Sequence, residues 1–402
     1  MNSGLMRLYL DHAAMGWPTV FNVDNSMQWG NPAASHSLGE QSRMALERAR
    51  GVVAKCIGAT NDKQVVFNSG GTEGNNTVIK GQRWSAIVTT PTEHHAVLHA
   101  AEDMKAQCGT QIVLIPVDSH GLVQRKALHS VLAPLQQGPV LVSVCLVNNE
   151  IGCINDLAAL STIIQQYNRN SEKRRFWLHT DAVQAPGHVN VNCEQLGVDF
   201  LTLSAHKFHG PVGCGILFCR EIGEASVLRP LLNGGEQQDG RRGGTEAVGA
   251  AMATAYALED ACNPNMFTKR IDNYCVWAAR LWNFLSPYIL AGLVLPTGPP
   301  PGKHRAPHHV SFCIKGTKRQ ELVQYLDKKE GILVSGGSAC SSSVPLPSHV
   351  LSAIGVPLEF INGSLRITFG SHLPENTTPE EVLDRLERAL QRLLELCVMK
   401  DY

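Results

Sequence analysis

The sequence of 402 residues has few charged residues and no excess of either sign. Charged side chains make up 17% of the chain, with 35 Lys and Arg against 35 Asp and Glu, whereas an average globular protein has about 25%. Balanced charge provides no basic surface for nucleic acid or for an anionic membrane. The apolar runs are also shorter than the roughly 18 residues that a membrane-spanning helix needs. No nucleic-acid or membrane partner is therefore expected.

The number and spacing of the cysteines do not match a disulfide scaffold or a zinc site. Twelve cysteines in 402 residues fall well below the roughly 8–10% of disulfide-stapled proteins, and no two form a Cys-x-x-Cys motif. Eleven are expected to be small buried residues, as in Val144-Cys145-Leu146. Cys340 differs, because small polar residues surround it at 338–343, which is typical of an exposed, reactive thiol. With no room for a signal peptide before the strand-like residues 8–10, the cytoplasm is the expected location.

Strand-like and helix-like segments alternate over the first 260 residues. Continuous apolar runs predict strands that are buried on both faces, as in a mostly parallel sheet between helices. A helix is predicted over residues 37–56 and another near 246–262, and strands are predicted over 64–67, 86–89, 112–117, 140–147, 176–179, 199–204 and 214–218.

The chain pattern changes after residue 262. Five prolines within residues 296–307 predict an irregular connection. Beyond it, strands and helices predict a smaller α+β domain, which ends in a helix with a capping box from Thr378 to Glu381 and Pro379 at its first position. We expect a large α/β domain over residues 16–262 and a small α+β domain from residues 1–15 and 263–402.

Three short stretches together indicate one cofactor. Ser69-Gly70-Gly71-Thr72 follows a strand and opens a helix, so its N–H groups can bind a phosphate monoester, although a plain helix-start turn fits equally well. Asp181 and Lys207 each follow a strand, where ligands bind in parallel sheets, although such residues are usually solvated. Pyridoxal phosphate requires all three features: an amine for its aldehyde, a carboxylate for its ring nitrogen and N–H groups for its phosphate.

Two further residues have both a functional and an ordinary interpretation. His94 lies at the start of a helix, where it could stack on a planar cofactor and move protons, or simply cap the helix. Arg366 lies on a predicted strand, where it could bind a substrate carboxylate with two parallel hydrogen bonds or form a surface salt bridge. The Ser204-x-x-Lys207 spacing also occurs in penicillin-binding enzymes, but their Ser-Asp-Asn and Lys-Thr-Gly motifs are absent from this sequence.

Nine ordered motifs make the sequence similar to a known family. The chain resembles, from about residue 8 to 395, the NifS/IscS-type cysteine desulfurases and the related selenocysteine lyases of the class V aminotransferase family, which have the pyridoxal-phosphate fold of type I. The motifs are Tyr9-Leu10-Asp11-His12-Ala13-Ala14, Gly30-Asn31-Pro32, Ser69-Gly70-Gly71-Thr72-Glu73, Glu93-His94, Asn148-Asn149-Glu150-Ile151-Gly152, His179-Thr180-Asp181-Ala182-Val183-Gln184, His206-Lys207-Phe208-His209-Gly210-Pro211, Arg242-Gly243-Gly244-Thr245-Glu246 and Gly337-Ser338-Ala339-Cys340-Ser341-Ser342.

The resemblance implies a role for each matching residue. Lys207 would bind pyridoxal phosphate covalently and move the α-proton, His94 would stack on its ring and assist proton transfer, and Cys340 would attack the substrate sulfur. Asn149 and Arg366 would hold the substrate carboxylate. The cofactor would also be bound by Gly71, Thr72, Asn149, Asp181 at the ring nitrogen, Gln184 at the ring hydroxyl, Ser204, His206, and Thr245 from the other subunit of a homodimer.

The implied reaction converts L-cysteine to L-alanine and leaves a persulfide on Cys340, from which sulfur passes to an acceptor protein. A selenocysteine lyase, which would pass on selenium from the same site, stays open as an alternative. An ordinary aminotransferase and a non-catalytic sulfur-relay scaffold are more remote. The sequence departs from the family at residues 14–18, at Ser371 and at a short insertion over 372–376, which could alter substrate or partner preference.

Overall fold

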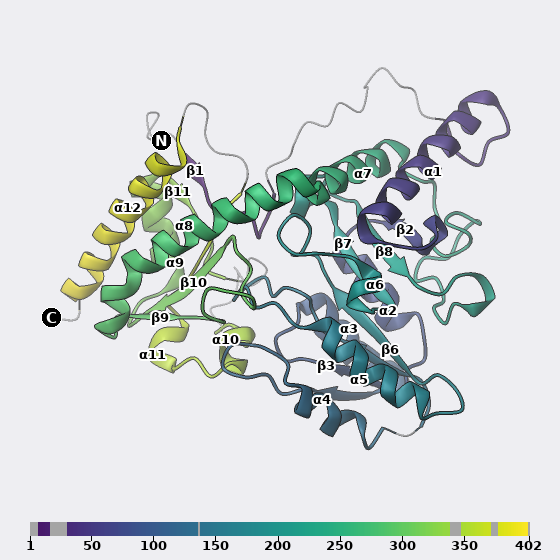
Figure 1. Cartoon of the computed structure of the whole chain (residues 1–402), viewed down its shortest axis with the longest axis horizontal. Helices are drawn as coiled ribbons and strands as arrows, with labels where there is room; N and C mark the ends of the chain where they lie inside the picture. The colour runs from purple at the N-terminus through teal and green to yellow at the C-terminus, as the bar shows by residue number, and fades with distance from the viewer. Residues whose placement is uncertain (1–6, 17–29, 136, 338–346, 371–376, 401–402) are drawn as a thin grey trace.

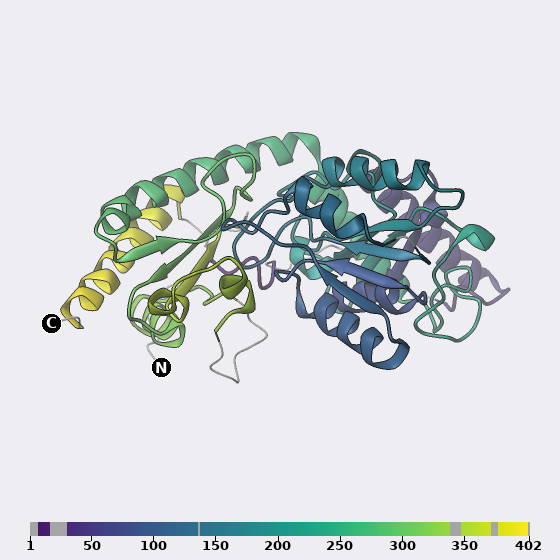
Figure 2. The same ribbon diagram turned by 90° about the horizontal axis from the view of Figure 1, so that it is seen from below.

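The computed structural model describes residues 7–16, 30–135, 137–337, 347–370 and 377–400. Two lobes lie side by side, and the long helix α8 (Pro264–Leu290) runs from one to the other (Figures 1 and 2). The predicted nucleophile Cys340 lies outside the described residues, as do Trp17, Pro18 and residues 371–376. None of the helices within the described ranges is long and apolar enough to cross a membrane.

The larger lobe is built on a seven-stranded sheet within the described part of the chain, in the order β2-β8-β7-β6-β5-β3-β4. Only β8 runs opposite to the others, because it pairs antiparallel with both β2 and β7. The predicted mostly parallel sheet is confirmed. The strands are β2 (Val65–Asn68), β3 (Ala86–Thr89), β4 (Gln111–Leu114), β5 (Val140–Ser143), β6 (Phe176–Asp181), β7 (Phe200–Ser204) and β8 (Gly215–Cys219).

Helices cover both faces of this sheet. Val140 and Val142 of β5 pack into one core, whereas Leu141 packs into the other, as the alternation of side chains along a strand requires. The first core contains α1 (Ser37–Ile57), α4 (Arg125–Leu132), α5 (Leu157–Arg169) and α7 (Val248–Cys262), and the second contains α2 (Gly71–Lys80) and α3 (His95–Cys108). Burial on both faces explains the continuous apolar runs of the strands.

The predicted strand over residues 140–147 is shorter in the structure, where β5 ends at Ser143. The apolar residues that follow are buried all the same, because Val144 and Leu146 continue the hydrogen bonding to the backbone of β6. The apolar pattern therefore indicated burial correctly and strand length incorrectly. Short helical segments complete the lobe: η1 (Asp62–Gln64), α6 (Cys193–Leu196), η2 (Ala205–Phe208) and η3 (Gly223–Ala225).

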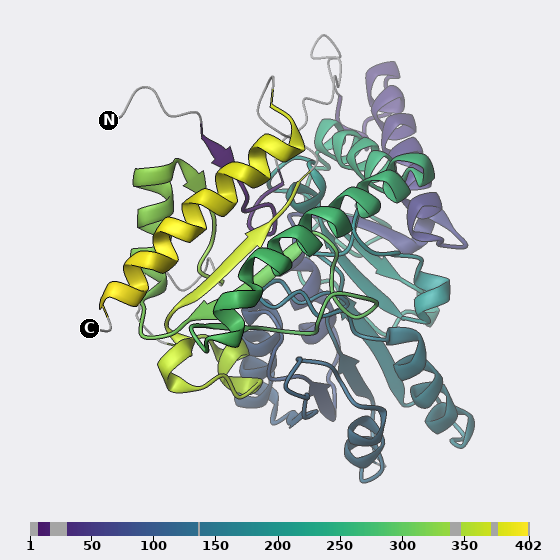
Figure 3. The ribbon, with the colours of Figure 1, turned by 60° about the vertical axis from the view of Figure 1, so that its left-hand side comes forward.

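The smaller lobe contains an antiparallel sheet in the order β12-β10-β9 and a parallel pair, β1 with β11. Helices α8 and α12 (Pro379–Lys400) lie side by side across it (Figure 3). The predicted capping box is confirmed, since the Glu381 N–H donates to Thr378 and the Glu381 carboxylate accepts from the Thr378 N–H. The other elements are β1 (Leu8–Tyr9), β9 (Val294–Pro296), β10 (His309–Ile314), α9 (Arg319–Tyr325), η4 (Leu326–Glu330), β11 (Ile332–Leu333), α10 (His349–Ala353), α11 (Leu358–Ile361) and β12 (Ser364–Thr368).

One helix was missed in the sequence, and one expectation needs correction. Helix α8 was not predicted, although Asn263 caps it and Pro264 opens it. The expectation that eleven cysteines are packed is wrong for Cys108 and Cys275, which are exposed because they lie on the solvent side of α3 and α8.

Candidate functional site

A cavity of about 320 Å³ lies at the carboxyl ends of the parallel strands, where the large lobe meets residues 13–14 and the small lobe. This is the edge of a parallel sheet where ligands bind. Ten of the residues predicted for the site line the cavity, and they come from segments far apart in the sequence. They are Gly71, Thr72, His94, Asn149, Asp181, Gln184, Ser204, His206, Lys207 and Arg366.

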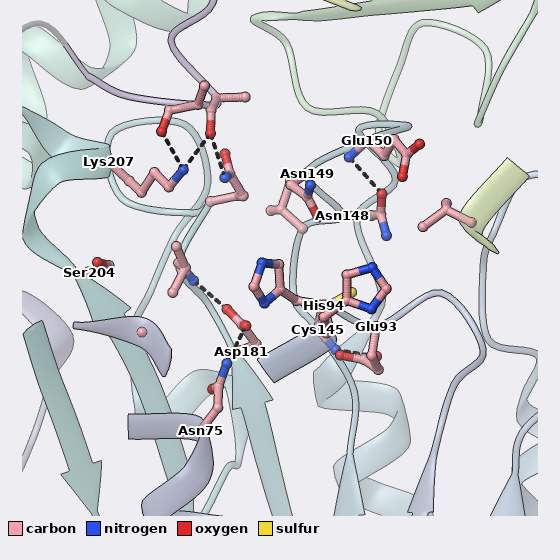
Figure 4. Close-up of a pocket in the computed structure, with 18 of the residues that line it drawn as sticks. Asn75, Glu93, His94, Cys145, Asn148, Asn149, Glu150, Asp181, Ser204 and Lys207 are labelled. Carbon is pink, nitrogen blue, oxygen red and sulfur yellow. Dashed lines mark hydrogen bonds between the residues drawn. The ribbon is translucent and has the colours of Figure 1, made fainter. Parts of the chain in front are cut away.

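The ammonium group of Lys207 lies at the wall of the cavity, held by the N-terminal segment. Lys207 is carried by the short turn η2, directly after β7. Its Nζ donates to the carbonyl oxygens of Ala13 (2.7 Å) and Ala14 (2.6 Å), and Figure 4 shows these contacts as dashed lines at the end of the Lys207 side chain. Gln184 Nε2 also donates to the Ala13 carbonyl, at 3.0 Å. The N-terminal segment therefore forms part of the site.

Asp181 ends β6 on the floor of the cavity. Its Oδ2 accepts a hydrogen bond from Asn75 Nδ2 at 2.6 Å, and its Oδ1 accepts from the Val183 N–H at 3.0 Å. The contact between Asp181 and Asn75 is visible in Figure 4. The two donors fix the orientation of the carboxylate, which retains lone pairs for a cationic N–H group of a ligand. Asn75 was not singled out in the sequence, although it lies within the helix that the glycine-rich stretch opens.

The start of α2 forms a cradle for an anion. Gly70 precedes the helix with φ 141°, and no side chain within the described residues caps the first turn. A Cβ on Gly71 would lie 2.8 Å from Val183 Cγ2, so the backbone approaches its neighbours more closely than a side chain would permit. Uncapped N–H groups and the positive end of the helix dipole together favour a phosphate.

Ser204 and His206 stand beside this cradle. Ser204 Oγ and His206 Nδ1 are 3.1 Å apart and share a hydrogen bond. Burial, together with the nearby Lys207 charge, lowers the pKa of His206 to about 4. The imidazole is therefore neutral at neutral pH and contributes an N–H group rather than a positive charge.

His94 caps a helix, as one interpretation of its position predicted, and it also lines the cavity; its stacking on a cofactor stays a prediction. Its Nδ1 accepts a hydrogen bond from the Ala96 N–H at 3.1 Å, at the start of α3. Burial lowers the pKa of His94, against the opposing effect of Asp181. Because Nδ1 is an acceptor, the neutral ring carries its proton on Nε2. His94 can therefore donate a proton or hydrogen bond to a ligand.

Glu93 is a buried acid beside the cavity that sequence reasoning did not single out. It is 0% exposed, and its Oε1 accepts from Thr90 Oγ1 and from the Cys145 N–H, both at 2.9 Å. Its Oε2 has no hydrogen-bond partner in the described ranges. Burial raises the pKa of Glu93 to about 8 and that of the Cys145 thiol well above its usual value. Glu93 is therefore mainly protonated at neutral pH, and Cys145 is not a nucleophile.

Arg366 is buried at the boundary of the two lobes and is only 2% exposed, so the surface salt bridge considered for it is wrong. It donates to the Asn149 carbonyl and to Asp11 Oδ1, each at 2.7 Å. Its Nε has no partner among the described residues. The guanidinium is thus fixed in place, and because these contacts use only two of its five N–H groups, donors remain for a ligand carboxylate.

One predicted residue, Thr245, is not brought to the cavity of this chain, and another, Cys340, lies outside the described residues. Thr245 is exposed and lies outside it, in a segment tied to the start of α2 by an ion pair between Arg242 and Glu73 at 2.9 Å. Its implied role toward a second subunit stays a prediction. The role of Cys340, outside the described residues, also stays a prediction.

Glu150 and His349 also line the cavity, and sequence reasoning assigned them no role. Glu150 belongs to a quoted motif, whereas nothing in the sequence around His349 distinguishes it. The His349 Nε2 lies 2.9 Å from the Glu93 carbonyl oxygen. Because a carbonyl can only accept, this nitrogen carries the proton.

The fold and the pocket define an α/β protein of fold type I with a lysine, a carboxylate and an anion cradle at one sheet edge. The chain matches the aminotransferase class-V family over residues 25–382. It is 37% identical to the cysteine desulfurase IscS of Dictyoglomus turgidum, over 96% of this chain and 95% of that protein. It is 34% identical to the cysteine desulfurase IscS of Methanosarcina thermophila, over 91% and 86%.

A solved structure titled NifS-like protein superposes with a TM-score of 0.79 at 29% identity, over 96% of this chain and 99% of that one. The chain therefore belongs to the aminotransferase class-V family, and the resemblance drawn from its motifs is confirmed.

Proposed function

We propose that the chain is a pyridoxal-phosphate-dependent cysteine desulfurase, which converts L-cysteine to L-alanine and retains the sulfur as a persulfide on Cys340. The observation that supports this most is the convergence of Lys207, Asp181 and the uncapped start of α2 on one cavity. Full-length relatives named cysteine desulfurases support the same reaction.

The residues of the cavity fit pyridoxal phosphate. The close approach at Gly71, where a Cβ would meet Val183, leaves the first-turn N–H groups of α2 open to a phosphate. Ser204 and neutral His206 would add hydrogen bonds to it. Asp181 would accept the ring N–H, and Lys207 Nζ would bind the aldehyde. When bound, the cofactor supplies an electron sink for negative charge at the substrate Cα.

The protein itself would supply orientation and proton transfer. The carbonyls of Ala13 and Ala14 hold Lys207 Nζ in the cavity, where the amine, once neutral, can take the α-proton. His94 carries its proton on Nε2 and would return one to the substrate. Arg366, fixed by Asp11 and Asn149, would orient the amino acid by its carboxylate.

The sulfur transfer balances without any further reagent. The Cys340 thiolate attacks the substrate sulfur, the substrate C–S bond breaks and an S–S bond forms. The electron pair of the broken bond passes to the substrate Cβ, which takes up the proton that the Cys340 thiol has lost. The products are L-alanine and the Cys340 persulfide. A thiolate is the suitable nucleophile because sulfur attacks sulfur more readily than oxygen or nitrogen does.

The purified protein is expected to show a visible absorbance band that borohydride removes, and to release alanine from L-cysteine. Lys207→Ala should lose the band, and Cys340→Ala should keep the band but lose turnover of L-cysteine. A colourless wild-type protein without a borohydride-reducible cofactor contradicts the proposal. Release of alanine from L-selenocysteine by Cys340→Ala would identify a selenocysteine lyase activity at the same site, and transamination of an added keto acid would identify an aminotransferase.

The homodimer, the acceptor protein, the domain boundary after residue 262 and the cytoplasmic location remain predictions. Thr245 is exposed and lies outside the cavity of its own chain. This position supports the dimer, because a cofactor contact from Thr245 would then have to be made in the cavity of a neighbouring molecule. Sedimentation of the purified protein, with Thr245→Ala assayed for cofactor affinity, tests this point.

A further inference from the structure

A second cavity, of about 600 Å³, lies in the small lobe where that lobe meets residues 119–120 of the large lobe. Its walls come from the C-terminal half of α8, from the loop after β9 and from the loop between α10 and α11. It shares no lining residue with the cavity at the sheet edge. Cavities that hold small organic molecules measure roughly 300–1,000 Å³, and this one lies within that range.

Arg305 is a buried cation at this second cavity. It lines the cavity and is only 4% exposed. Its guanidinium donates to the backbone carbonyl oxygens of Pro299, Thr297 and His309, the last at 3.2 Å. No aspartate or glutamate of the described residues contributes to its electrostatic surroundings. Burial lowers the pKa of Arg305 to about 10, so the guanidinium keeps its positive charge at neutral pH.

The three carbonyl groups satisfy hydrogen bonds of Arg305 but carry no net charge. Burying a charge is unfavourable unless an opposite charge lies nearby. A guanidinium also has five N–H groups, and the carbonyls use three of them. One positive charge and two N–H groups are therefore available to an anion in the cavity.

Trp282 supplies a further hydrogen-bond donor beside Arg305. The Arg305 Cζ atom lies 5.1 Å from the centre of the Trp282 ring, and both side chains line the cavity. Trp282 Nε1 is buried and has no hydrogen-bond partner within the described part of the chain. Because an indole N–H can only donate, a ligand that brings an acceptor atom would satisfy it.

The loop around Arg305 is held in place by the large lobe. Gly298 has φ 76°, and a Cβ on it would lie 3.2 Å from Arg305 Nη2, so the loop approaches the guanidinium closely. The Ile154 N–H donates to the His304 carbonyl at 2.8 Å, and His120 Nδ1 lies 3.1 Å from the Gly298 carbonyl oxygen. The cavity is therefore already formed, and a ligand has little of the protein to order when it binds.

The remaining walls define the body of the ligand. Apolar side chains of Ile289, Leu295, Ile354 and Val356 line the cavity around the two donor groups. Apolar walls favour an apolar body, because it leaves water on binding. A single cation matches a single negative charge, whereas the second charge of a phosphate dianion would be left unpaired beside apolar walls.

We propose that this second cavity binds a small organic carboxylate with an aromatic or branched apolar body. The carboxylate pairs with Arg305 and accepts a hydrogen bond from Trp282 Nε1, and the apolar body packs against the side chains of α8 and of the loop between α10 and α11. The proposal does not rest on the proposed function, because none of these residues binds the cofactor or the substrate of that reaction.

The test is binding of 4-fluorophenylacetate to the purified holoenzyme, followed by ¹⁹F NMR. The dissociation constant should be on the order of 1 mM or lower, which a ligand of this size reaches in a fitting pocket. Arg305 also holds three carbonyl groups, so its charge is tested from the side of the ligand. The neutral 4-fluorophenylacetamide has the same shape and should bind about tenfold more weakly or worse.

Two variants and two controls locate the probe. Trp282→Phe keeps an aromatic ring but removes the N–H group, and should weaken binding about tenfold. Val356→Trp fills the cavity and should abolish binding, which keeps the test open if Trp282→Phe does not fold. Trp277→Phe, on the same helix but outside the cavity, is the matched control. Arg366→Lys alters only the cavity at the sheet edge and should bind the probe as wild type does.

Equal affinities for the acid and the amide overturn the proposal, because the charge of Arg305 would then play no part. Unchanged binding in both Trp282→Phe and Val356→Trp also overturns it. A loss of binding in Arg366→Lys does so as well, because the probe would then occupy the cavity at the sheet edge. The proposed function is tested separately by the absorbance band and by alanine release, so its failure is distinguishable.

Discussion

Glu93→Gln is expected to change how the stability of the protein depends on pH. The wild-type carboxyl group is fully buried, and burial raises its pKa from 4.5 to about 8. The folded-state pKa lies above the unfolded-state pKa, so the protonated carboxyl group adds to the free energy of unfolding. This contribution is fully present below about pH 4.5. This contribution is lost as the pH rises through 8, because the folded protein must then give up the proton or unfold.

The size of the effect follows from the shift. Each unit of difference in pKa corresponds to about 1.4 kcal/mol, so the wild type should lose about 2 kcal/mol of unfolding free energy between pH 6 and pH 8 from this group. The amide of the Glu93→Gln variant cannot ionise, so the variant loses nothing from this position. The amide oxygen can still accept from Thr90 and the Cys145 N–H, as Glu93 Oε1 does. The amide NH₂ group lacks an acceptor, which costs about 1–3 kcal/mol at every pH.

The assay is denaturant unfolding of the cofactor-free protein at pH 6, 7 and 8. The unfolding free energy of Glu93→Gln, relative to wild type, should rise by about 2 kcal/mol over this range, whatever its value at pH 6. Glu102→Gln, at an exposed position of α3, is the matched control and should show no such trend. A constant difference between Glu93→Gln and wild type would refute the reasoning, because Glu93 would then be ionised throughout.

Three other substitutions test separate parts of the site. Asp181→Asn removes the charge that would face the cofactor ring and keeps only one of the two oxygens that accept from Asn75 and Val183, and kcat should fall on the order of 10²-fold; an unchanged kcat excludes the assigned role. Arg366→Lys should raise KM for L-cysteine about tenfold, since a hydrogen bond between charged groups is worth roughly 1.5 kcal/mol or more. Gly70→Ala introduces a side chain at φ 141°, so calorimetry should find a melting temperature lower by a few degrees, together with weaker cofactor binding; a normal melting temperature would show that the turn relaxes.

The sequence predicted what depends on local pattern. Continuous apolar runs predicted strands covered on both faces, and residues placed directly after two such runs, Asp181 and Lys207, met at one sheet edge because parallel strands end on the same side. The glycines at the start of α2 also predicted an open helix start, because glycine has no side chain that could cover the first N–H groups.

Long-range contacts could not be predicted in this way. The Ala13 carbonyl that holds Lys207 lies 194 residues away from it, and nothing in either local sequence specifies the pairing. Burial of Arg366 likewise depends on how the two lobes pack against each other, and no short stretch of the sequence specifies that packing. Glu93 and Glu150 were inside recognised motifs, but a carboxyl group becomes informative only when its burial and its unpartnered oxygen are known.

The pairing of Asp11 with Arg366 places a constraint on the order of events during synthesis. The two residues are 355 positions apart, and ribosomes add roughly 5–20 residues per second. About 20–70 seconds therefore separate the synthesis of Asp11 from that of Arg366. Residues 13–14, which hold Lys207, belong to the same early segment. The nascent chain can complete the large sheet long before the cavity wall has its final support, so the newly made enzyme becomes competent only when translation is nearly over.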